Sequence, residues 1–244
     1  MKNRELKSSK IAYSPISKKL TSPGDRRRFC YFAEKIGLGY EIYDPSKNYD
    51  IVILSQNSDI SFWSKYPTNT DIVFDFIDSY LSEAITFKSL FRGLAKFISG
   101  QNSSFEFSYK KALKRMCSRS NAVICSTTEQ KHAINQYCNN TYIIFDAHFK
   151  DANSIKKDYS FDGKFKLVWE GLGSNIFQLK KLSKIISSSD ISTPIEINVI
   201  TDKRSYKFLN KYFEVDNESY LKSLAIDCIF HEWSLDNLSK VCIK

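Results

Sequence analysis

The sequence predicts an α/β protein in which βα units surround two mostly parallel sheets. Short β-branched or aromatic runs alternate with longer helical patterns from one end of the chain to the other, which is typical of such units. The 244 residues, 42% of them hydrophobic and 14% aromatic, correspond to about one and a half to two domains with a real core. A polar, charged stretch interrupts the alternation, so we expect two domains joined by a linker.

The first domain is predicted over residues 1–150. The apolar spacing between the predicted strands indicates helices, and Thr127, followed by Glu129 and Gln130, indicates a capped helix start directly after a strand. The predicted strands are 11–16, 40–43, 50–54, 71–76, 122–126 and 142–145. The predicted helices follow Asp25 and Asp59 and cover 79–98, 105–119 and 128–137.

The linker is predicted at 151–164 and a second α/β domain at 165–244. The linker is polar and charged and has no hydrophobic period. The region after it holds three βα units, whereas a doubly wound nucleotide-binding half usually has about five or six strands. The second domain is therefore expected to be incomplete. Its predicted elements are strand 166–169, a Gly-rich turn, helix 176–187, strand 195–200, helix 203–213, strand 225–230 and a helical turn after Ser234.

Charge and cysteine content restrict the function classes. The net charge of +9 favours acidic partners such as nucleic acid, phosphorylated small molecules or an anionic membrane surface. Six cysteines without a C-x-x-C pair, and only three histidines, indicate neither a zinc site nor a disulfide framework. A reduced, cytoplasmic setting fits this cysteine usage. The polar, basic N-terminus and the lack of any apolar run of about 18 residues disfavour secretion and membrane spanning.

The first candidate site lies between the first strand and the first strong helix, in the segment S-P-G-D-R-R-R-F. Gly24 permits a tight backbone path, and a helix N-terminus with arginine side chains nearby suits a phosphate or carboxylate. In the alternative reading, Asp25 caps the helix and Arg26, Arg27 and Arg28 form a solvated first turn. Positive charge there opposes the helix dipole, so these arginines need an anion or a carboxylate partner.

The second candidate site follows the strand at 71–76. Strand ends in open α/β sheets point into the ligand crevice, so Asp75 or Asp78 would bind sugar hydroxyls or act as a base. Asp78 is the candidate catalytic residue. The alternative is that Asp78 or Ser79 caps the next helix.

The third candidate site follows the first strand of the second domain, in the segment W-E-G-L-G-S-N. Gly171 and Gly173 before a helix start let backbone amides approach a diphosphate. A plain turn before an N-cap at Ser174 or Asn175 uses the same residues. The segment is neither a Walker A loop nor a full G-x-G-x-x-G. The three histidines show no catalytic or metal-ligand spacing, so no metal is expected.

Two amphipathic patterns bear on membranes. Apolar residues recur at helical spacing beside basic ones, which describes either a core face with a solvated face or a helix lying on anionic lipid. Nucleic acid is not expected as a partner, because the basic residues do not interleave with aromatic residues in one module. The apolar positions are Phe87, Leu90, Phe91, Leu94 and Phe97 in the first pattern, and Phe105, Tyr109, Ala112, Leu113 and Met116 in the second.

The chain resembles retaining bacterial glycosyltransferases of the group 4 type, which have the GT-B fold and use nucleotide sugars. The resemblance covers nearly the whole chain, in the segments 22–29 (SPGDRRRF), 49–54 (YDIVIL), 73–81 (VFDFIDSYL), 122–130 (AVICSTTEQ) and 167–171 (LVWEG). It implies two Rossmann-like domains that face a cleft, the first for the acceptor and the second for the donor nucleotide. It also implies no metal held by an Asp-x-Asp motif and no cofactor, with the nucleotide sugar as substrate.

By this resemblance Gly24, Asp25 and the three arginines serve the acceptor side, and Gly171, Gly173, Ser174, Asn175 and Arg204 serve the donor side. The sequence departs from the family in two ways. The usual basic residue after the donor-side glycine is missing, which leaves Lys180, Lys181 or Arg204 as substitutes. The family's Glu-x7-Glu segment has no counterpart after Gly171, since Glu196, Glu214, Glu218 and Glu232 are separated by 18, 4 and 14 residues. The donor domain is therefore expected to be truncated.

The resemblance implies a glycosyltransferase that moves a hexose-like sugar from a nucleotide donor to a surface glycan or lipid-linked acceptor. Its expected location is the cytoplasm, at the inner face of the plasma membrane, with a peripheral contact to anionic lipid. Whether this chain is active alone is left open. The alternative is a non-catalytic α/β binding protein or inactive transferase remnant, and a basic nucleic-acid partner is the third and weakest interpretation.

Overall fold

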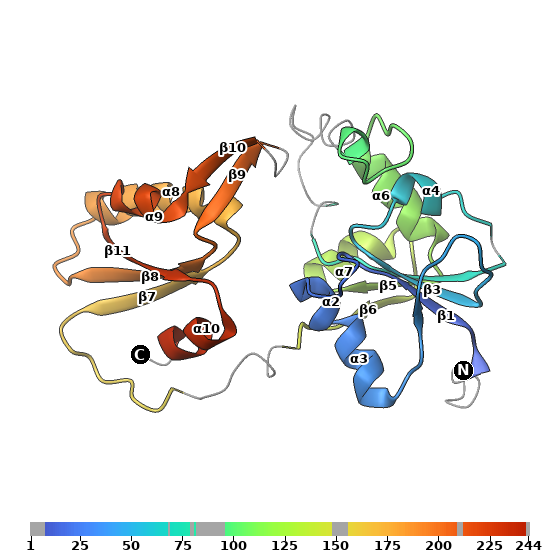
Figure 1. Ribbon diagram of the computed structural model, residues 1–244, viewed down its shortest axis with the longest axis horizontal. Coiled ribbons are helices and arrows are strands. Elements are labelled where there is room, and N and C mark those ends of the chain that lie inside the picture. Colours follow the sequence, from blue (N-terminus) through green and yellow to red (C-terminus); the bar gives the residue numbers. More distant parts are fainter. Residues whose placement is uncertain are drawn as a thin grey trace. The chain divides into compact units, whose positions relative to one another are not determined.

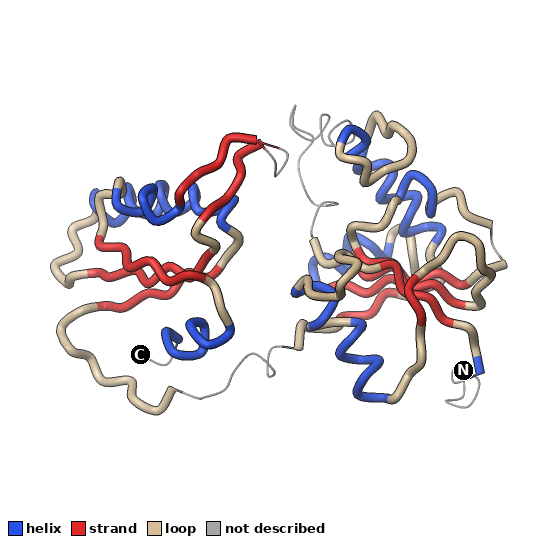
Figure 2. The backbone as a smooth tube through the Cα atoms, viewed as in Figure 1, coloured by secondary structure: helices blue, strands red, loops and turns tan. Residues whose placement is uncertain are grey.

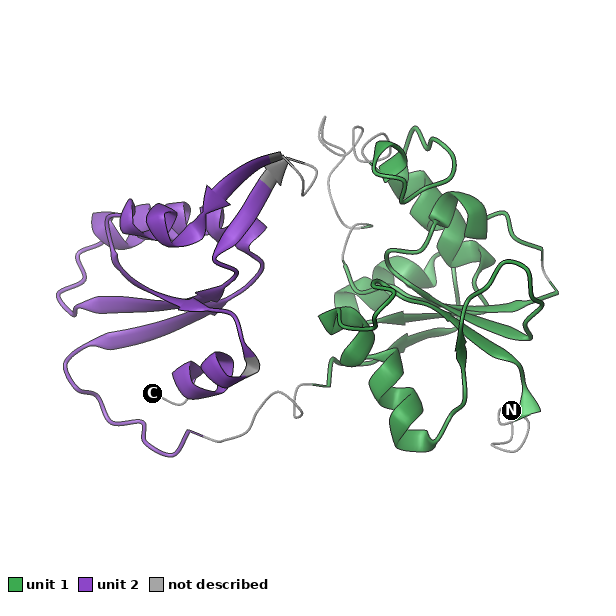
Figure 3. Cartoon of the chain, viewed as in Figure 1, with its two compact units in different colours: residues 1–147 green, residues 148–244 purple. Residues whose placement is uncertain are grey.

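The computed structural model describes residues 8–67, 69–78, 81, 96–147, 156–208 and 212–242. The chain divides into two compact units, Met1–Ala147 (unit 1) and His148–Lys244 (unit 2) (Figure 3). In each unit helices pack against a parallel sheet (Figure 2), so the predicted α/β class and Rossmann-like architecture are confirmed. Within the described ranges, no helix combines the length and the apolar character that crossing a bilayer requires.

Unit 1 is built on a six-stranded sheet in which every neighbouring pair is parallel. Its strand order is β2-β1-β3-β4-β5-β6. Each strand overlaps a predicted one, since each contains β-branched residues, which favour strands. The strands are β1 (Ile11–Ser14), β2 (Glu41–Ile42), β3 (Ile51–Ser55), β4 (Asp71–Asp75), β5 (Ala122–Cys125) and β6 (Thr141–Ile143).

The helices of unit 1 cover both faces of this sheet (Figure 1). Thr127 caps α7 through a hydrogen bond from the Gln130 amide (3.1 Å), as predicted, and Ser108 caps α6. Most of the predicted helix at 79–98, with its apolar positions up to Leu94, lies outside the described residues. The helices are α2 (Pro23–Arg26), α3 (Phe29–Ile36), α4 (Ile60–Trp63), α6 (Tyr109–Arg119) and α7 (Thr128–Asn135).

The two faces of the sheet carry different cores. The larger core joins one face to α4, α6 and α7, and it includes Leu113 and Met116 of α6. The smaller core packs α3 on β1 and β3. Beside α3, the side chains of Val73 and Ile124 help to line an apolar cavity of about 410 Å³ on the same face.

Unit 2 has a three-stranded parallel sheet in the order β11-β8-β7. Helices α8 and α9 lie on one face and α10 on the other (Figure 1), and α10 packs on β7 and β8. The strands are β7 (Phe165–Glu170), β8 (Ile195–Thr201) and β11 (Asp227–Glu232). The helices are the 3₁₀ turn η1 (Gly173–Gln178), α8 (Leu179–Ser188), α9 (Asn217–Lys222) and α10 (Leu235–Cys242).

The predicted helix at 203–213 is wrong. The segment forms an antiparallel ribbon of β9 (Arg204–Phe208) and β10 (Tyr212–Asp216). Aromatic residues at every second position of β9 favour a strand, and facing side chains across the ribbon stabilise the pair. Arg204 and Glu214 form such a cross-strand ion pair at 3.4 Å. A helical pattern in this segment was therefore a misreading of a period of two.

Candidate functional site

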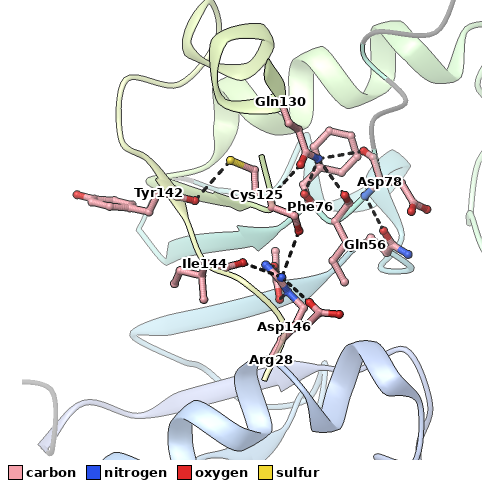
Figure 4. Close-up of polar contacts among 12 residues, drawn as sticks. Arg28, Gln56, Phe76, Asp78, Cys125, Gln130, Tyr142, Ile144 and Asp146 are labelled. Carbon is pink, nitrogen blue, oxygen red and sulfur yellow. Dashed lines mark hydrogen bonds and ion pairs between the residues drawn. The ribbon is translucent and has the colours of Figure 1, made fainter. Parts of the chain in front are cut away.

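The carboxyl ends of the six strands of unit 1 form the first candidate region. Ligands of open α/β sheets bind at this edge, where the strand order reverses, and in unit 1 the order reverses between β1 and β3. The predicted residues Gly24 to Arg28 follow β1, and Asp78 follows β4. Figure 4 shows the polar contacts at this edge.

Arg28 is buried in a network of internal partners. Its Nε and Nη2 donate to the Asp75 carboxylate at 2.8 and 2.6 Å, and its Nη1 donates to the Asp146 carboxylate at 2.8 Å and to the Ile144 carbonyl at 2.9 Å. The guanidinium thus joins the start of α3 to the ends of β4 and β6 (Figure 4). Asp75 and Asp146 are the carboxylate partners that this arginine turn was expected to need.

Burial and pairing act in opposite directions on the pKa values of Arg28 and Asp75. Burial lowers the pKa of Arg28, but the hydrogen bonds to Asp75 and Asp146 outweigh burial and raise it overall. Burial raises the pKa of Asp75, and the Arg28 hydrogen bonds oppose that rise. Arg28 therefore stays charged and holds the strand ends together.

Asp25 is fully buried and holds the loop after β1. Its carboxylate accepts from the Tyr13 hydroxyl (2.7 Å), the Ile16 amide (2.7 Å) and the Ser17 amide (2.9 Å). Burial, followed by the Asp25 contact, raises the pKa of Tyr13. The carboxylate does not cap α2, whose N-cap is Ser22.

The neighbours of Asp25 also contact the chain itself. A Cβ at Gly24 would meet the Cδ1 methyl group of Ile16 and would lie 3.3 Å from that of Ile77, so Gly24 packs on side chains of the loops after β1 and β4. Arg26 and Arg27 both interact with other groups of the chain, and the Arg27 carbonyl accepts from the Ala147 amide at 2.8 Å. The predicted acceptor-side turn is therefore built into the fold of unit 1.

Asp78 stands at the carboxyl edge with its backbone fixed and its side chain available. Its amide donates to Gln56 Oε1 (3.1 Å), and its carbonyl accepts from Gln130 Nε2 (3.1 Å). Gln130 also donates to the carbonyl of Phe76 (2.7 Å), so this buried side chain of α7 fixes the loop after β4 (Figure 4). The Asp78 carboxylate forms no hydrogen bond or ion pair with the residues that the structure describes.

Three serines that the motif analysis did not select lie at the same strand ends. The Ser58 hydroxyl, after β3, bonds the Ser14 hydroxyl at the end of β1 (2.9 Å). The Ser55 hydroxyl, at the end of β3, is buried and has no hydrogen-bond partner among the residues that the structure describes. The signal that could have found them is their position after β1 and β3, where the strand order reverses. Both Ser55 and Ser58 are buried, so their hydroxyls lie beneath the surface of this edge.

The cavity of about 410 Å³ beside α3 has different chemistry. Its walls are mainly hydrocarbon, from residues such as Phe32, Val73 and Ile144. The charged groups at its wall include Arg28 and Asp75, which pair with each other. This cavity therefore suits apolar groups and is a poor site for a sugar or a phosphate.

The second candidate region is a pocket of about 260 Å³ in unit 2. It brings the predicted Gly173 and Ser174 together with residues of α8, α9 and the ribbon. Hydroxyls, one ammonium and tyrosine rings share its wall. Besides Gly173 and Ser174 the lining consists of Ile176, Phe177, Lys180, Ser205, Tyr206, Val215 and Tyr220.

Lys180 supplies the positive charge of this pocket. It is an exposed residue of α8, and no carboxylate of the described residues pairs with its ammonium. An unpaired ammonium beside hydroxyls suits a phosphate. Tyr206, from the ribbon, adds a flat aromatic side chain on which a base can stack. The ribbon was missed from the sequence, and so was Tyr206.

The other predicted donor residues lie outside the lining of this pocket. The Gly171 carbonyl accepts from the Thr201 hydroxyl (2.7 Å), and a Cβ at Gly171 would meet the Trp169 ring at 2.8 Å. Asn175 is exposed, and its amide closes a turn onto the Leu172 carbonyl at 2.8 Å. Arg204 pairs with Glu214 on the exposed ribbon.

Metal ligands and histidines add no further site to the described part of the chain. There, no three His, Cys, Asp or Glu side chains gather in a way that could hold a metal ion. His231 Nε2 lies 2.9 Å from Asn198 Oδ1 within the sheet of unit 2. All six cysteines are free thiols.

The chain was compared with known proteins. No family model matches it, and no curated protein matches its sequence. Among solved structures it is similar to TarM, a glycosyltransferase, with a TM-score of 0.40 and 13% sequence identity. The similarity covers 84% of this chain and 35% of TarM, so the chain spans about a third of the length of TarM. At these values the similarity assigns no function, which has to be inferred from the residues of the two units.

Proposed function

We propose that the chain belongs to a retaining glycosyltransferase of the GT-B type and that the pocket of about 260 Å³ in unit 2, called the donor pocket from here on, takes the nucleotide sugar. The observation that carries this proposal is the meeting of Gly173, Ser174 and Lys180 with Tyr206 in one pocket. These residues come from η1, α8 and the ribbon. Their chemistry combines a cation and a hydroxyl for a diphosphate with an aromatic ring for a base.

The position of the donor pocket in the sheet supports the same function. It begins directly after β7, at the carboxyl end of a parallel strand. The helix after β7 lies on one face of the sheet and the helix after β11 lies on the other, where it packs beneath β7 (Figure 1). The pocket therefore lies at the carboxyl end of β7, the edge of the sheet at which open α/β proteins bind their ligands.

For the acceptor we propose the carboxyl edge of unit 1. The Asp78 carboxylate would bind sugar hydroxyls of a surface glycan or a lipid-linked acceptor. Asp78 is the candidate base, because its backbone is held on both sides while its carboxylate is available. Gly24, Asp25 and the three arginines support this edge by fixing the loops around it.

The proposed reaction involves no metal and no cofactor. The leaving group is a nucleoside diphosphate, whose developing charge Lys180 would stabilise. Gly173 lets the ribbon and α9 approach the pocket, since a Cβ there would collide with Asn217. We propose the cytoplasm as the setting, because nucleotide sugars and free thiols both fit it.

Titration calorimetry of the full chain with uridine diphosphate and with a panel of nucleotide sugars tests the donor pocket. Lys180→Gln is expected to weaken binding by about tenfold or more, the usual effect of losing one charge-assisted hydrogen bond. Lys181→Gln is the matched control, because Lys181 is also an exposed lysine of α8 but does not line the pocket. Tyr206→Ala is expected to weaken binding of every base. Equal affinities of the two lysine variants would refute the assignment.

The second candidate function is a non-catalytic binding protein or an inactive transferase remnant. The observation in its favour is that Asp25 and Arg28 bind groups of the chain itself. An assay of sugar transfer distinguishes the transferase from the binding protein. The chain is assayed alone and together with a polypeptide that supplies a Glu-x7-Glu donor segment. Nucleotide binding without transfer in either case identifies a binding protein, whereas transfer that Asp78→Asn abolishes identifies the enzyme.

A further inference from the structure

Four apolar side chains are exposed together on unit 1, in the segment 96–108, which we call the aromatic loop. The exposed fractions are 82% for Phe107, 64% for Ile98, 44% for Phe97 and 40% for Phe105. The three rings touch in series, with centroids 6.3 Å apart for Phe97 and Phe105 and 4.7 Å apart for Phe105 and Phe107. A contiguous exposed apolar patch of this kind marks an interaction site.

The aromatic loop is held in place by the body of unit 1. The Ser103 amide donates to the Asp59 carboxylate at 2.7 Å, and the Ser104 amide donates to the Ser61 hydroxyl at 3.1 Å. Both acceptors belong to the N-terminal end of α4, beside which the loop lies (Figure 1). At the other end Glu106, which is buried, accepts from Arg115 of α6 at 2.7 Å. The rings are therefore presented by a fixed scaffold.

The segment that carries the exposed rings is rich in basic residues. Between residues 96 and 115 the sequence has five basic residues and one acidic residue, Glu106. Glu106 is neutralised by Arg115 and by Lys65, whose ammonium lies 3.8 Å away. Lys111 is exposed, and Lys96 lies over the Tyr109 ring with its ammonium 4.4 Å from the centroid. The excess of basic residues in this segment favours a negatively charged partner.

The adjoining helix α6 directs its own apolar face inward. Leu113 and Met116 are fully buried in the larger core of unit 1. The apolar positions of this helix therefore form core, and the exposed apolar groups of the region are those of the aromatic loop.

We propose that the aromatic loop docks unit 1 on an anionic lipid bilayer. Phe107 and Ile98 enter the boundary between headgroups and acyl chains, while Lys96 and Lys111 contact the negative headgroups. Apolar burial and attraction between lysines and anionic lipid act together in such contacts. The patch consists of four side chains, which is small for a stable protein interface, where about 20–30 residues a side are usual.

Flotation of the full chain with vesicles tests the proposal. Vesicles of phosphatidylcholine mixed with phosphatidylglycerol are expected to carry the chain, and vesicles of phosphatidylcholine alone are expected to carry much less. The double variant Ile98→Ser with Phe107→Ser is expected to lower the bound fraction by about tenfold or more, because two apolar side chains no longer enter the bilayer. Phe161→Ser is the matched control, since Phe161 is 64% exposed in unit 2.

A second variant separates docking from misfolding. Phe107→Trp keeps an aromatic side chain, and its emission is expected to move to shorter wavelength when anionic vesicles are added, after subtraction of the wild-type signal. No flotation with anionic vesicles, equal flotation of the double variant, or an unmoved emission would each overturn the proposal. Self-association without lipid that the double variant abolishes would assign the patch to a protein contact instead. Calorimetry with nucleotides tests the donor pocket without vesicles. Failure of the lipid proposal and failure of the donor-pocket proposal can therefore be told apart.

Discussion

The backbone of Gly173 lies directly against the side-chain amide of Asn217, with no space for a Cβ atom between them. Asn217 is fully buried and fixed on both sides, because its Nδ2 donates to the Asp202 carbonyl (2.7 Å) and its Oδ1 accepts from the Ser205 hydroxyl (2.9 Å). We expect Gly173→Ala to destabilise unit 2 by about 1–3 kcal/mol, the usual cost of overpacking. Calorimetric unfolding measures this loss, and titration of uridine diphosphate should show weaker binding.

Gly39→Ala is the control for the glycine substitution itself. A Cβ at Gly39 meets no atom within 4 Å, and Gly39 does not have a positive φ. The change is expected to leave stability unchanged or to raise it by a fraction of a kcal/mol, by restricting the unfolded chain. Equal destabilisation by the two substitutions would mean that the contact with Asn217 has no special effect.

Arg28→Met is expected to destabilise unit 1 by about 3–5 kcal/mol, because it leaves the Asp75 carboxylate buried without its partner. The side chains of Arg28 and Asp75 are 1% and 5% exposed. The double variant, Arg28→Met with Asp75→Leu, should lose less free energy of unfolding than the sum of the losses in the two single variants. A double-mutant cycle on the midpoint of thermal unfolding measures the difference, and strict additivity would contradict the pairing.

The Arg28→Met variant should also depend on pH. Burial raises the pKa of Asp75, and the loss of Arg28 removes the hydrogen bonds that oppose this rise. Between the unfolded and the folded pKa of this carboxyl, the native state binds more protons than the unfolded state, so the free energy of unfolding falls as pH rises. We expect the variant to be more stable in mild acid than at neutral pH, and thermal scans across that range would show the slope.

Local sequence signals sufficed for most of the sheets. Residues 51–55 are buried at every position, and a continuous apolar run of that length predicts a strand of a parallel sheet. The cap at Thr127 was also predictable, because its partner, the Gln130 amide, is three residues away. Strands and helix caps that depend only on residues within one strand or one helical turn can be predicted from the sequence alone.

Contacts between distant residues could not be predicted in the same way. Arg28 bonds Asp146, which is 118 residues away in the sequence, so the motif indicated a need for a carboxylate without indicating which one. The ribbon of β9 and β10 was mistaken for a helix, and its Tyr206 was missed. Gly173 was selected for access to a diphosphate, whereas its close approach to Asn217 appears only in the folded unit.

Asp59→Asn is expected to loosen the aromatic loop. Burial would raise the pKa of Asp59, but hydrogen bonds from Ser103 and Ser61 outweigh burial and lower it. A lowered folded pKa gives stability that is present above the unfolded pKa and is lost as pH falls through the folded pKa. Asparagine keeps one acceptor oxygen and can still cap α4, but its second group is an amide nitrogen that cannot accept from the Ser103 amide. The variant should lose about 0.5–1.5 kcal/mol, the usual net contribution of one hydrogen bond, and most of this acid dependence.

Hydrogen exchange at the Ser103 and Ser104 amides measures the attachment of the loop locally. Both amides should exchange faster in Asp59→Asn than in the wild type. Asp190→Asn serves as the control, since Asp190 is exposed in unit 2. Unchanged protection of both amides in the Asp59 variant would show that this carboxylate does not hold the loop.

Alkylation of the native chain should distinguish Cys117 sharply from Cys242. Burial raises the pKa of Cys117 to about 12, and its side chain lies in the larger core of unit 1. Cys242 is exposed near the end of α10. Because alkylation needs an accessible thiolate, iodoacetamide should modify Cys242 first and reach Cys117 only when unit 1 unfolds.

Peptide mass spectrometry of timed samples gives both alkylation rates, and Cys242→Ser should remove the fast one. Modification of Cys117 at the rate of Cys242 in the native chain would mean that the core around α6 opens readily.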